Sequence, residues 1–257
     1  MSAWQKFIDE VRGHIYELEQ DGCDVPFFRG HRDARWSLLC GLERARHDAR
    51  KTHLESILYY DFLSQGGPLL QRPYSSWDVL FSMQHHGLPT RLLDWSATFS
   101  VSVYFALRPY VYHSAAELEL LSKTSSNPCV WVLDPFELNL SMSDCKTIIN
   151  PETDLPNTYQ EIFIDEEKES NAEVIAINPT QLGRRLAAQR GCFTLHSNLS
   201  MPLEHDSPYY LKKFDIPAEA ISDGIGFLKL SGIHEHHLFP DLDGLARHLN
   251  KLHVTRN

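Results

Sequence analysis

The sequence lacks every short motif that would place the chain in one of the large, familiar enzyme classes. It contains no phosphate loop, no Rossmann glycine fingerprint, no H-E-x-x-H zinc motif and no G-x-S-x-G nucleophile motif. No apolar run approaches the length of a membrane span, and the first residues lack the basic-then-apolar order of a signal peptide. These absences predict a cytoplasmic protein with no membrane partner.

Cysteine and positive charge are also scarce. The 5 cysteines form no C-x-x-C pair, which argues against both a disulfide framework and a thiolate zinc site. The 24 Lys and Arg residues are outnumbered by 34 Asp and Glu, so the formal net charge is -10. Nucleic acid would repel a protein this acidic, and a polynucleotide would have to meet a local basic patch. The acidity equally suits a basic protein partner, or simply keeps the protein soluble.

The chain is long enough, at 257 residues, to bury a sizeable core, and its composition is that of an ordinary globular protein. It has no internal repeat and no evident linker. We therefore expect a single α+β domain, with a mixed central β-sheet flanked by helices. An N-terminal helix over 1–24 would precede the main domain at 25–257, which carries an acidic loop at about 150–171.

Residue periodicity predicts the individual elements. Helices are expected over 3–20, 54–62, 77–84, 98–107, 179–189, 218–230 and 242–252. Strands are expected over 25–31, 90–95, 129–134, 173–178, 191–196 and 209–216. The strand at 129–134 is apolar apart from its last residue, Asp134, which predicts a central position in the sheet.

The stretch from Gln84 to Trp95 is the densest collection of polar chemistry in the chain. It reads Gln-His-His-Gly-Leu-Pro-Thr-Arg-Leu-Leu-Asp-Trp, and apolar runs flank it on both sides. Polar groups carried into a core are costly unless they are paired, so this density indicates a site.

Helix, tight turn, strand and helix are expected to build this stretch. Gln84 falls on the apolar face of the first helix and should point inward. Gly87 and Pro89 end that helix, and Ser96 is placed to cap the helix that follows the strand. A site beside a helix N-terminus at the end of a buried strand is a common place to bind a phosphate.

Two further clusters are each open to two interpretations. A basic stretch follows Arg29 and contains Arg32, Arg35, Arg44, Arg46 and Arg50. It is either a solvated helix face or a rim that binds phosphate through guanidinium groups. His234-Glu235-His236-His237 suggests a metal, but no second ligand cluster completes a shell, so no metal site is predicted.

Several blocks together resemble the FRG domain family. They are Phe28-Arg29-Gly30-His31, Gln84 to Trp95, Tyr104-Phe105-Ala106, Gln189 to Thr194, and the tail Leu238-Phe239-Pro240-Asp241-Leu242. The order of these motifs is similar to that of the ADP-ribosyltransferase fold. In that fold, an arginine on the first strand, a Ser/Thr strand leading into a helix, and a glutamate on a later strand hold NAD.

This resemblance implies an NAD-dependent mono-ADP-ribosyltransferase that uses NAD as its substrate. It implies catalytic roles for Arg29, His85, Asp94 and Gln189. It also implies a cofactor-binding set of Arg29, Gly30, His31, Gln84, Thr90, Arg91, Ser96 and Phe193. The chain departs from the pattern in having no glutamate at the third position, so either Gln189 substitutes for it or Asp94 supplies the carboxylate.

The resemblance further implies a bacterial toxin or anti-phage effector, with a neutralising antitoxin as partner. The target would be nucleic acid, with RNA favoured, or protein. Arg32, Arg35, Arg44, Arg46 and Arg50 favour nucleic acid, whereas the net charge argues against it. Two other classes stay open. One is a non-catalytic nucleotide-binding module, which would explain the missing glutamate, and the other is a metal-dependent nuclease using Gln84, His85 and Asp94.

Overall fold

A sheet with helices on both faces forms the described part of the chain. The computed structural model describes residues 1–48, 53–70, 73–113, 126–170, 172–179, 183–205 and 208–254. Its strands are β1 (Phe27–His31), β2 (Leu92–Ser96), β3 (Cys129–Leu133), β4 (Val174–Ile177), β5 (Gly191–His196) and β6 (Leu211–Asp215). No helix in these ranges is both long and apolar enough to cross a membrane.

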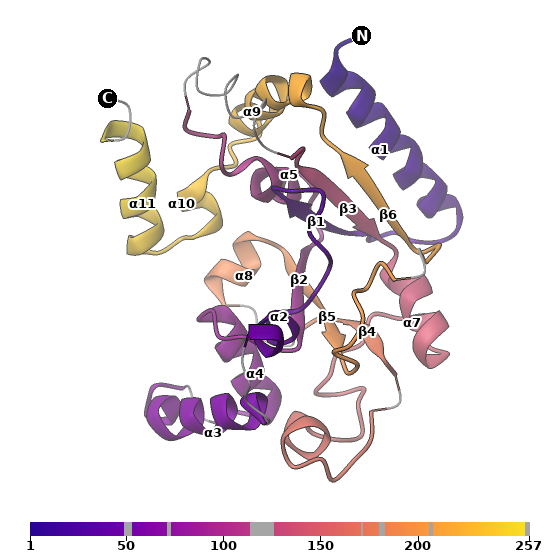
Figure 1. Cartoon of the computed structure of the whole chain (residues 1–257), viewed down its shortest axis with the longest axis vertical. Coiled ribbons are helices and arrows are strands. Elements are labelled where there is room, and N and C mark those ends of the chain that lie inside the picture. The colour runs from indigo at the N-terminus through magenta and orange to yellow at the C-terminus, as the bar shows by residue number, and fades with distance from the viewer. Residues whose placement is uncertain are drawn as a thin grey trace.

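The helices lie between and around these strands (Figure 1). The longer ones are α1 (Ala3–Gln20), α2 (Gly41–Asp48), α3 (Leu54–Gly66), α4 (Ser76–His85), α5 (Phe99–Leu107), α7 (Pro135–Ser143), α9 (Ile221–Leu230) and α11 (Leu242–His253). The shorter ones are η1 (Gly67–Leu69), η2 (Gln160–Ile164), α8 (Arg184–Ala188), η3 (Ala218–Ala220) and α10 (Glu235–Leu238).

The six strands form one sheet in the order β4-β5-β2-β1-β3-β6. Every pair of neighbouring strands is antiparallel, so the expected mixed sheet is wrong. The only parallel pairing among the described residues is an isolated bridge between Ile149 and Ile177. Strand direction depends on how the long connections cross the sheet, and residue periodicity does not encode that path.

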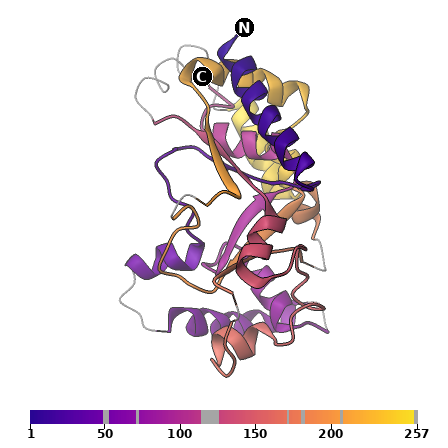
Figure 2. The ribbon, with the colours of Figure 1, turned by 90° about the vertical axis from the view of Figure 1, so that its right-hand side faces the viewer.

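Three apolar clusters cover the two faces of the sheet. On one face, α1, α5 and α9 pack against β1, β3 and β6. On the same face, α3, α4 and η2 pack against β2, β4 and β5. α7 and the segment before α2 cover the opposite face. In Figures 1 and 2, the indigo α1 and orange α9 lie at the opposite end of the molecule from the purple α3 and α4.

Most local predictions are confirmed, with two corrections. The acidic loop at 150–171 contains the π-helix η2, because Phe163 and Ile164 are buried against the α3–α4 cluster despite the surrounding carboxylates. Ser96 does not cap α5, which begins after Thr98. Instead, the Ser96 hydroxyl donates to the Gln189 carbonyl at 2.7 Å and accepts from the Thr98 N–H at 3.0 Å.

A fully buried carboxylate attaches the C-terminal segment to α5. Glu235 is 0% exposed, and its oxygens accept from the Tyr104 hydroxyl at 2.7 Å and the Lys251 ammonium at 2.9 Å. Arg108 and Arg247 donate to it at 2.8 and 3.1 Å. Burial alone would raise its pKa, but the Tyr104 and Lys251 hydrogen bonds and the neighbouring positive charges lower the pKa to about 2.

Glu235→Gln should lower the free energy of unfolding by about 3 kcal/mol, because it leaves the buried Tyr104 hydroxyl and the partly exposed Arg108 and Lys251 without a charged acceptor. The stabilisation from this carboxylate is complete above its ordinary pKa and is lost as the pH falls through about 2. Urea unfolding at pH 7 measures the loss, and Glu19→Gln at an exposed position is the control. Equal stability of the two variants would contradict this role.

β1 lies unusually close to α5 at Gly30. A Cβ at Gly30 would meet the Ser102 carbonyl oxygen and lie 2.6 Å from the Ala106 nitrogen. These are backbone atoms, which cannot move aside as a flexible side chain would. The absence of a side chain at Gly30 therefore sets the distance between β1 and α5.

Gly30→Ala should destabilise the protein by about 1–3 kcal/mol, since the methyl group forces β1 and α5 apart. Gly13→Ala is the matched control, because no atom lies within 4 Å of the place that its Cβ would occupy and the position is inside a helix. That control should gain up to about 1 kcal/mol. Thermal melts of both variants check the difference, and a Gly30→Ala melting temperature equal to wild type would contradict it.

Candidate functional site

Three neighbouring strands carry the polar blocks singled out in the sequence. β1 carries Arg29, β2 carries Asp94, and Gln189 comes just before β5. β2 lies between β1 and β5 in the sheet, as Figure 1 shows. Residues that are far apart in the chain thus meet at the middle of the sheet.

The sheet is nearly split between β1 and β2. These strands share the single residue pair Phe28 and Ser96, whereas β2 and β5 pair along their whole length. Just beyond that pair, the Arg29 Nη1 donates to the main-chain carbonyl of Asp94. A side chain thus connects the two strands where the backbone ladder has stopped.

The Arg29 guanidinium carries a charge that no carboxylate neutralises closely. It is half-buried, and its Nε donates to the Nε2 of His31 at 3.0 Å. Among the described residues, no carboxylate oxygen lies within 4.0 Å of it. Desolvation lowers the pKa of Arg29 to about 10, and the Asp94 charge offsets part of this shift, so the group stays protonated at neutral pH. Such a charge favours a bound anion.

His31 is held neutral beside this charge. Burial and the positive charge of Arg29 lower the pKa of His31 to about 3. Because Arg29 donates to Nε2, that nitrogen is the acceptor, and the ring proton is assigned to Nδ1. His31 therefore orients the guanidinium without adding to its charge.

The Asp94 carboxylate is exposed but held in one orientation. Its Oδ2 accepts from the Gln84 Nε2 at 2.8 Å. The Gln84 Oε1 in turn accepts from the Thr90 hydroxyl at 2.5 Å. The expectation that Gln84 points inward is confirmed. The network leaves a fixed carboxylate on the surface of β2, where a ligand can reach it.

His85 lies at the end of α4, next to this network. Its main-chain carbonyl accepts from the Arg185 Nη1 at 3.1 Å. Desolvation, followed by the charges of Arg185 and His86, lowers the pKa of the His85 ring. The ring is therefore neutral at pH 7 and able to accept a proton.

Arg185 and Phe239 join this region, although residue patterns gave neither of them a role. The Arg185 guanidinium lies 4.7 Å from the centroid of the Phe239 ring. Phe239 belongs to the C-terminal tail motif, which was the one signal that could have drawn attention to it. Arg185 belongs to none of the motifs that resemble the FRG domain.

Four of the predicted site residues lie nearby but make packing contacts. The Gln189 Nε2 donates to the Leu238 carbonyl at 3.0 Å, and its own carbonyl accepts from Ser96. Phe193 is buried and packs against Phe81 with ring centroids 5.6 Å apart. Gly30 packs on α5. These residues hold β1, β2 and β5 against their helices.

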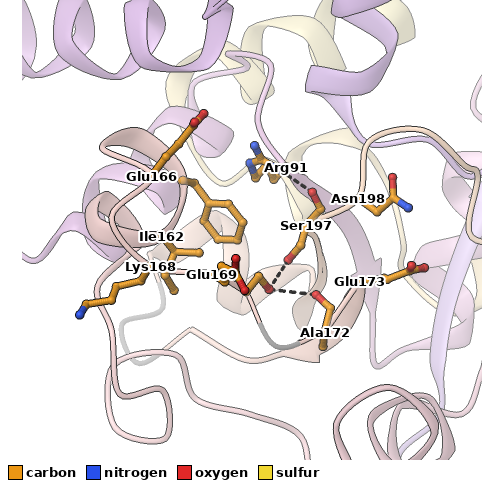
Figure 3. A pocket seen from close by; sticks show the side chains of 11 residues that line it. Arg91, Ile162, Glu166, Lys168, Glu169, Ala172, Glu173, Ser197 and Asn198 are labelled. Carbon is orange, nitrogen blue, oxygen red and sulfur yellow. Dashed lines mark hydrogen bonds between the residues drawn. The ribbon is translucent and has the colours of Figure 1, made fainter.

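Arg91 directly precedes β2, but its side chain makes contacts outside the Arg29–Asp94 site. Its Nε donates to both oxygens of Glu55 at 2.6 and 2.8 Å, and its Nη1 donates to the Ser197 carbonyl at 2.8 Å. It lines a separate hollow of about 500 Å³ beside the acidic loop (Figure 3). In that hollow, Arg91 lies among Glu166, Lys168 and Glu169, away from the β1–β2 split.

The arginines of the basic stretch after β1 differ in their contacts, and only Arg35 forms an ion pair among the described residues. Arg35 pairs with Asp33 at 2.7 Å, and the Arg32 guanidinium stacks 4.7 Å from the centre of the Trp36 ring. Arg44 donates to the Leu39 carbonyl. The Arg46 side chain and the whole of Arg50 fall outside the described residues.

The histidine-rich segment packs around α11. The His234 and His248 rings stack with centroids 4.5 Å apart, and the Tyr112 hydroxyl lies 3.2 Å from the Nδ1 of His248. Within the described ranges, no three His, Cys, Asp or Glu side chains are grouped so that they could hold a metal ion.

Comparison with known proteins identifies one family. The family model of the FRG domain matches residues 25–114. That range includes Arg29, the stretch from Gln84 to Trp95, and α5, but the Gln189 block and the C-terminal tail lie beyond it. No curated protein and no solved structure matches the chain. The resemblance to the FRG domain that the motifs indicated is confirmed, and the chain contains an FRG domain at residues 25–114.

Proposed function

We propose that this FRG protein binds NAD at the β1–β2 split and transfers its ADP-ribose group to an acceptor. The observation that carries the proposal is the half-buried Arg29 guanidinium, which has no close carboxylate partner among the described residues. It donates to the main-chain carbonyl of Asp94, whose own carboxylate is exposed and held by Gln84. One group is suited to bind an anion and the other to stabilise a developing positive charge. A pyridine dinucleotide needs both when its glycosidic bond breaks.

The arrangement of strands supports an ADP-ribosyltransferase-like fold. In the fold that the motifs resemble, an arginine strand, a Ser/Thr strand leading into a helix, and a third strand together form the NAD site. In this chain β1, β2 with α5, and β5 are in neighbouring positions. These three strands are far apart in sequence but neighbours in the sheet, as an ADP-ribosyltransferase-like NAD site requires.

Arg29 would bind the pyrophosphate of NAD. A guanidinium offers paired N–H donors that match phosphate oxygens, and a desolvated one gains more from an anion than an exposed one does. His31 restricts the side chain by accepting from its Nε, which reduces the entropy lost when the phosphate binds.

Asp94 would stabilise the reacting ribose. The bond between the ribose carbon and nicotinamide breaks, and its electron pair leaves with nicotinamide, so positive charge develops on the ribose. A carboxylate held in place by Gln84 stabilises that charge without having to reorganise. The acceptor atom then bonds to the ribose carbon, and its proton passes to the neutral ring of His85.

Two residues are candidates to replace the missing glutamate: Gln189, through its amide, and Asp94, through its carboxylate. β5 begins at Gly191, and the Gln189 amide is committed to the Leu238 carbonyl. Asp94 is therefore the better candidate for the carboxylate that the third strand fails to supply. Gln189 would act by positioning the C-terminal segment.

RNA is the acceptor we favour. Arg32 and Arg44 follow the strand that carries Arg29 and form no ion pair with a described carboxylate, so they remain able to contact a phosphate backbone. A local patch of this kind is what a polynucleotide would need on a chain with a net charge of -10. The toxin setting and an antitoxin partner remain predictions from the family resemblance.

A binding module without turnover is the second candidate. It is favoured by the absence of a glutamate on β5 and by the engagement of Gln189 in packing. The protein would then recognise a nucleotide through Arg29 and leave its glycosidic bond intact.

Purified protein incubated with NAD labelled in its adenylate phosphate should transfer label to RNA and release nicotinamide. Arg29→Lys keeps the charge but loses the paired donors, and Asp94→Asn keeps an acceptor for Gln84 but loses the charge. Each variant should reduce transfer about 100-fold, because each removes a group that stabilises the transition state. Asp61→Asn, at an exposed position on α3, should transfer as wild type does.

Separate RNA, DNA and protein pools identify the acceptor, and thermal melts show that each variant is folded. Full activity in both variants would refute the assigned roles. Nucleotide binding by wild type without nicotinamide release would favour the binding module. Transfer of label to protein alone would refute RNA as the acceptor.

A further inference from the structure

Arg185 is a second half-buried arginine without a close carboxylate partner. It lies on α8, and its guanidinium packs 4.7 Å from the Phe239 ring centre. Its Nη1 donates to the main-chain carbonyl of His85 at 3.1 Å, and this acceptor carries no charge. No carboxylate oxygen of the described chain lies within 4.0 Å of it. Burial lowers the pKa of Arg185, although Asp94 and Asp241 act in the opposite direction.

The surrounding charges leave Arg185 as the cation that is not neutralised. Arg108 and Arg247 also lie over the Phe239 ring, at 5.4 and 5.3 Å from its centre. Both of them form ion pairs with the buried Glu235, as Lys251 does. Arg185 is the remaining guanidinium on this ring among the described residues, and Glu235 has no hydrogen bond with it.

α8 lies on the face of the sheet from which the Asp94 carboxylate projects. Register pairs Gly191 with Ser96, and a Cβ at Gly191 would meet the Leu186 side chain of α8. Asp94 is two residues from Ser96 and therefore projects from the same face. Arg29 precedes Gly30 by one residue and follows Phe28, which pairs with Ser96, so its side chain starts from the opposite face.

Asp94 is the carboxylate with the strongest favourable charge interaction for both arginines, yet it forms a close ion pair with neither. The two guanidiniums therefore approach β2 from its two faces, at the position where the sheet is split. A ligand with two linked negative groups would neutralise both of them. The space beside Asp94 would receive the sugar attached to those groups.

We propose that Arg185 binds a phosphate of the dinucleotide, as the partner of Arg29 in holding its pyrophosphate. This inference rests on the proposed function and extends it to a residue outside the recognised FRG region at 25–114. Phe239 positions the guanidinium by stacking, and the His85 carbonyl fixes one of its nitrogens, which leaves the other N–H groups for the ligand.

The adjacent Arg184 provides a matched control. It lies on the same short helix, carries the same charge and is exposed to solvent. A substitution there changes the net charge by the same amount without touching Phe239 or His85. The comparison separates a specific contact from general attraction of an anion.

Calorimetric titration with ADP-ribose and with inorganic pyrophosphate tests the inference. Arg185→Gln should weaken ADP-ribose binding about 10-fold or more, as expected for loss of a charged hydrogen bond, and Arg184→Gln should change it by less than about 2-fold. Arg185→Lys, which keeps the charge, should bind with intermediate affinity. If Arg185→Gln fails to fold in a thermal melt, Arg185→Lys decides the outcome.

Arg185 variants that bind ADP-ribose as wild type does would overturn the inference, even if wild type transfers ADP-ribose. Binding that depends on Arg185, in a wild-type protein that releases no nicotinamide from NAD, would keep the inference and reject the transferase. A wild-type protein that binds neither probe would overturn both proposals. A loss of affinity that is equal in the Arg184 and Arg185 variants would show nonspecific attraction and also overturn the inference.

Discussion

The hydrogen bond from Arg29 to the Asp94 carbonyl is the contact on which the centre of the molecule depends. β1 and β2 share one residue pair, so the backbone ladder does not hold the two halves of the sheet together along their length. A charged side chain takes over that role and is desolvated in doing so. The same contact that joins the strands therefore leaves an uncompensated charge beside the split. We propose that this charge forms a site for an anion.

The C-terminal segment packs against the centre of the sheet and contributes a residue, Phe239, to the candidate site. Gln189 holds the Leu238 carbonyl, and the next residue, Phe239, packs against Arg185 beside His85. The fully buried Glu235 attaches this segment to α5, whose close approach to β1 requires Gly30. The FRG region at 25–114 supplies one side of the candidate site, and residues far beyond it supply the other.

The local secondary structure could be predicted from the sequence wherever apolar residues recur at a regular spacing. Apolar spacing predicted the helix α1 at its observed ends, and a glycine followed by an apolar run predicted β5. The inward direction of Gln84 followed from the same spacing. In the acidic segment, carboxylates outnumber the apolar residues, so the burial of Phe163 could not be read from composition.

Long-range pairing is the part that the sequence did not reveal. Arg91 stands next to Thr90 in the chain, but Glu55 on a distant helix pairs with it and takes it away from the candidate site. Arg185 acquires its position from Phe239, which is far from it in sequence. The antiparallel arrangement of all the strands likewise depends on how the chain crosses the sheet. Each of these outcomes is decided by tertiary contacts that a residue pattern does not specify.

A crystal structure of the protein with bound ADP-ribose would show directly whether Arg29 and Arg185 hold the dinucleotide. We predict pyrophosphate oxygens within hydrogen-bonding distance of both the Arg29 and Arg185 guanidiniums, with the terminal ribose beside the Asp94 carboxylate. Ligand bound instead in the Arg91 hollow, or away from the β1–β2 split, would contradict it.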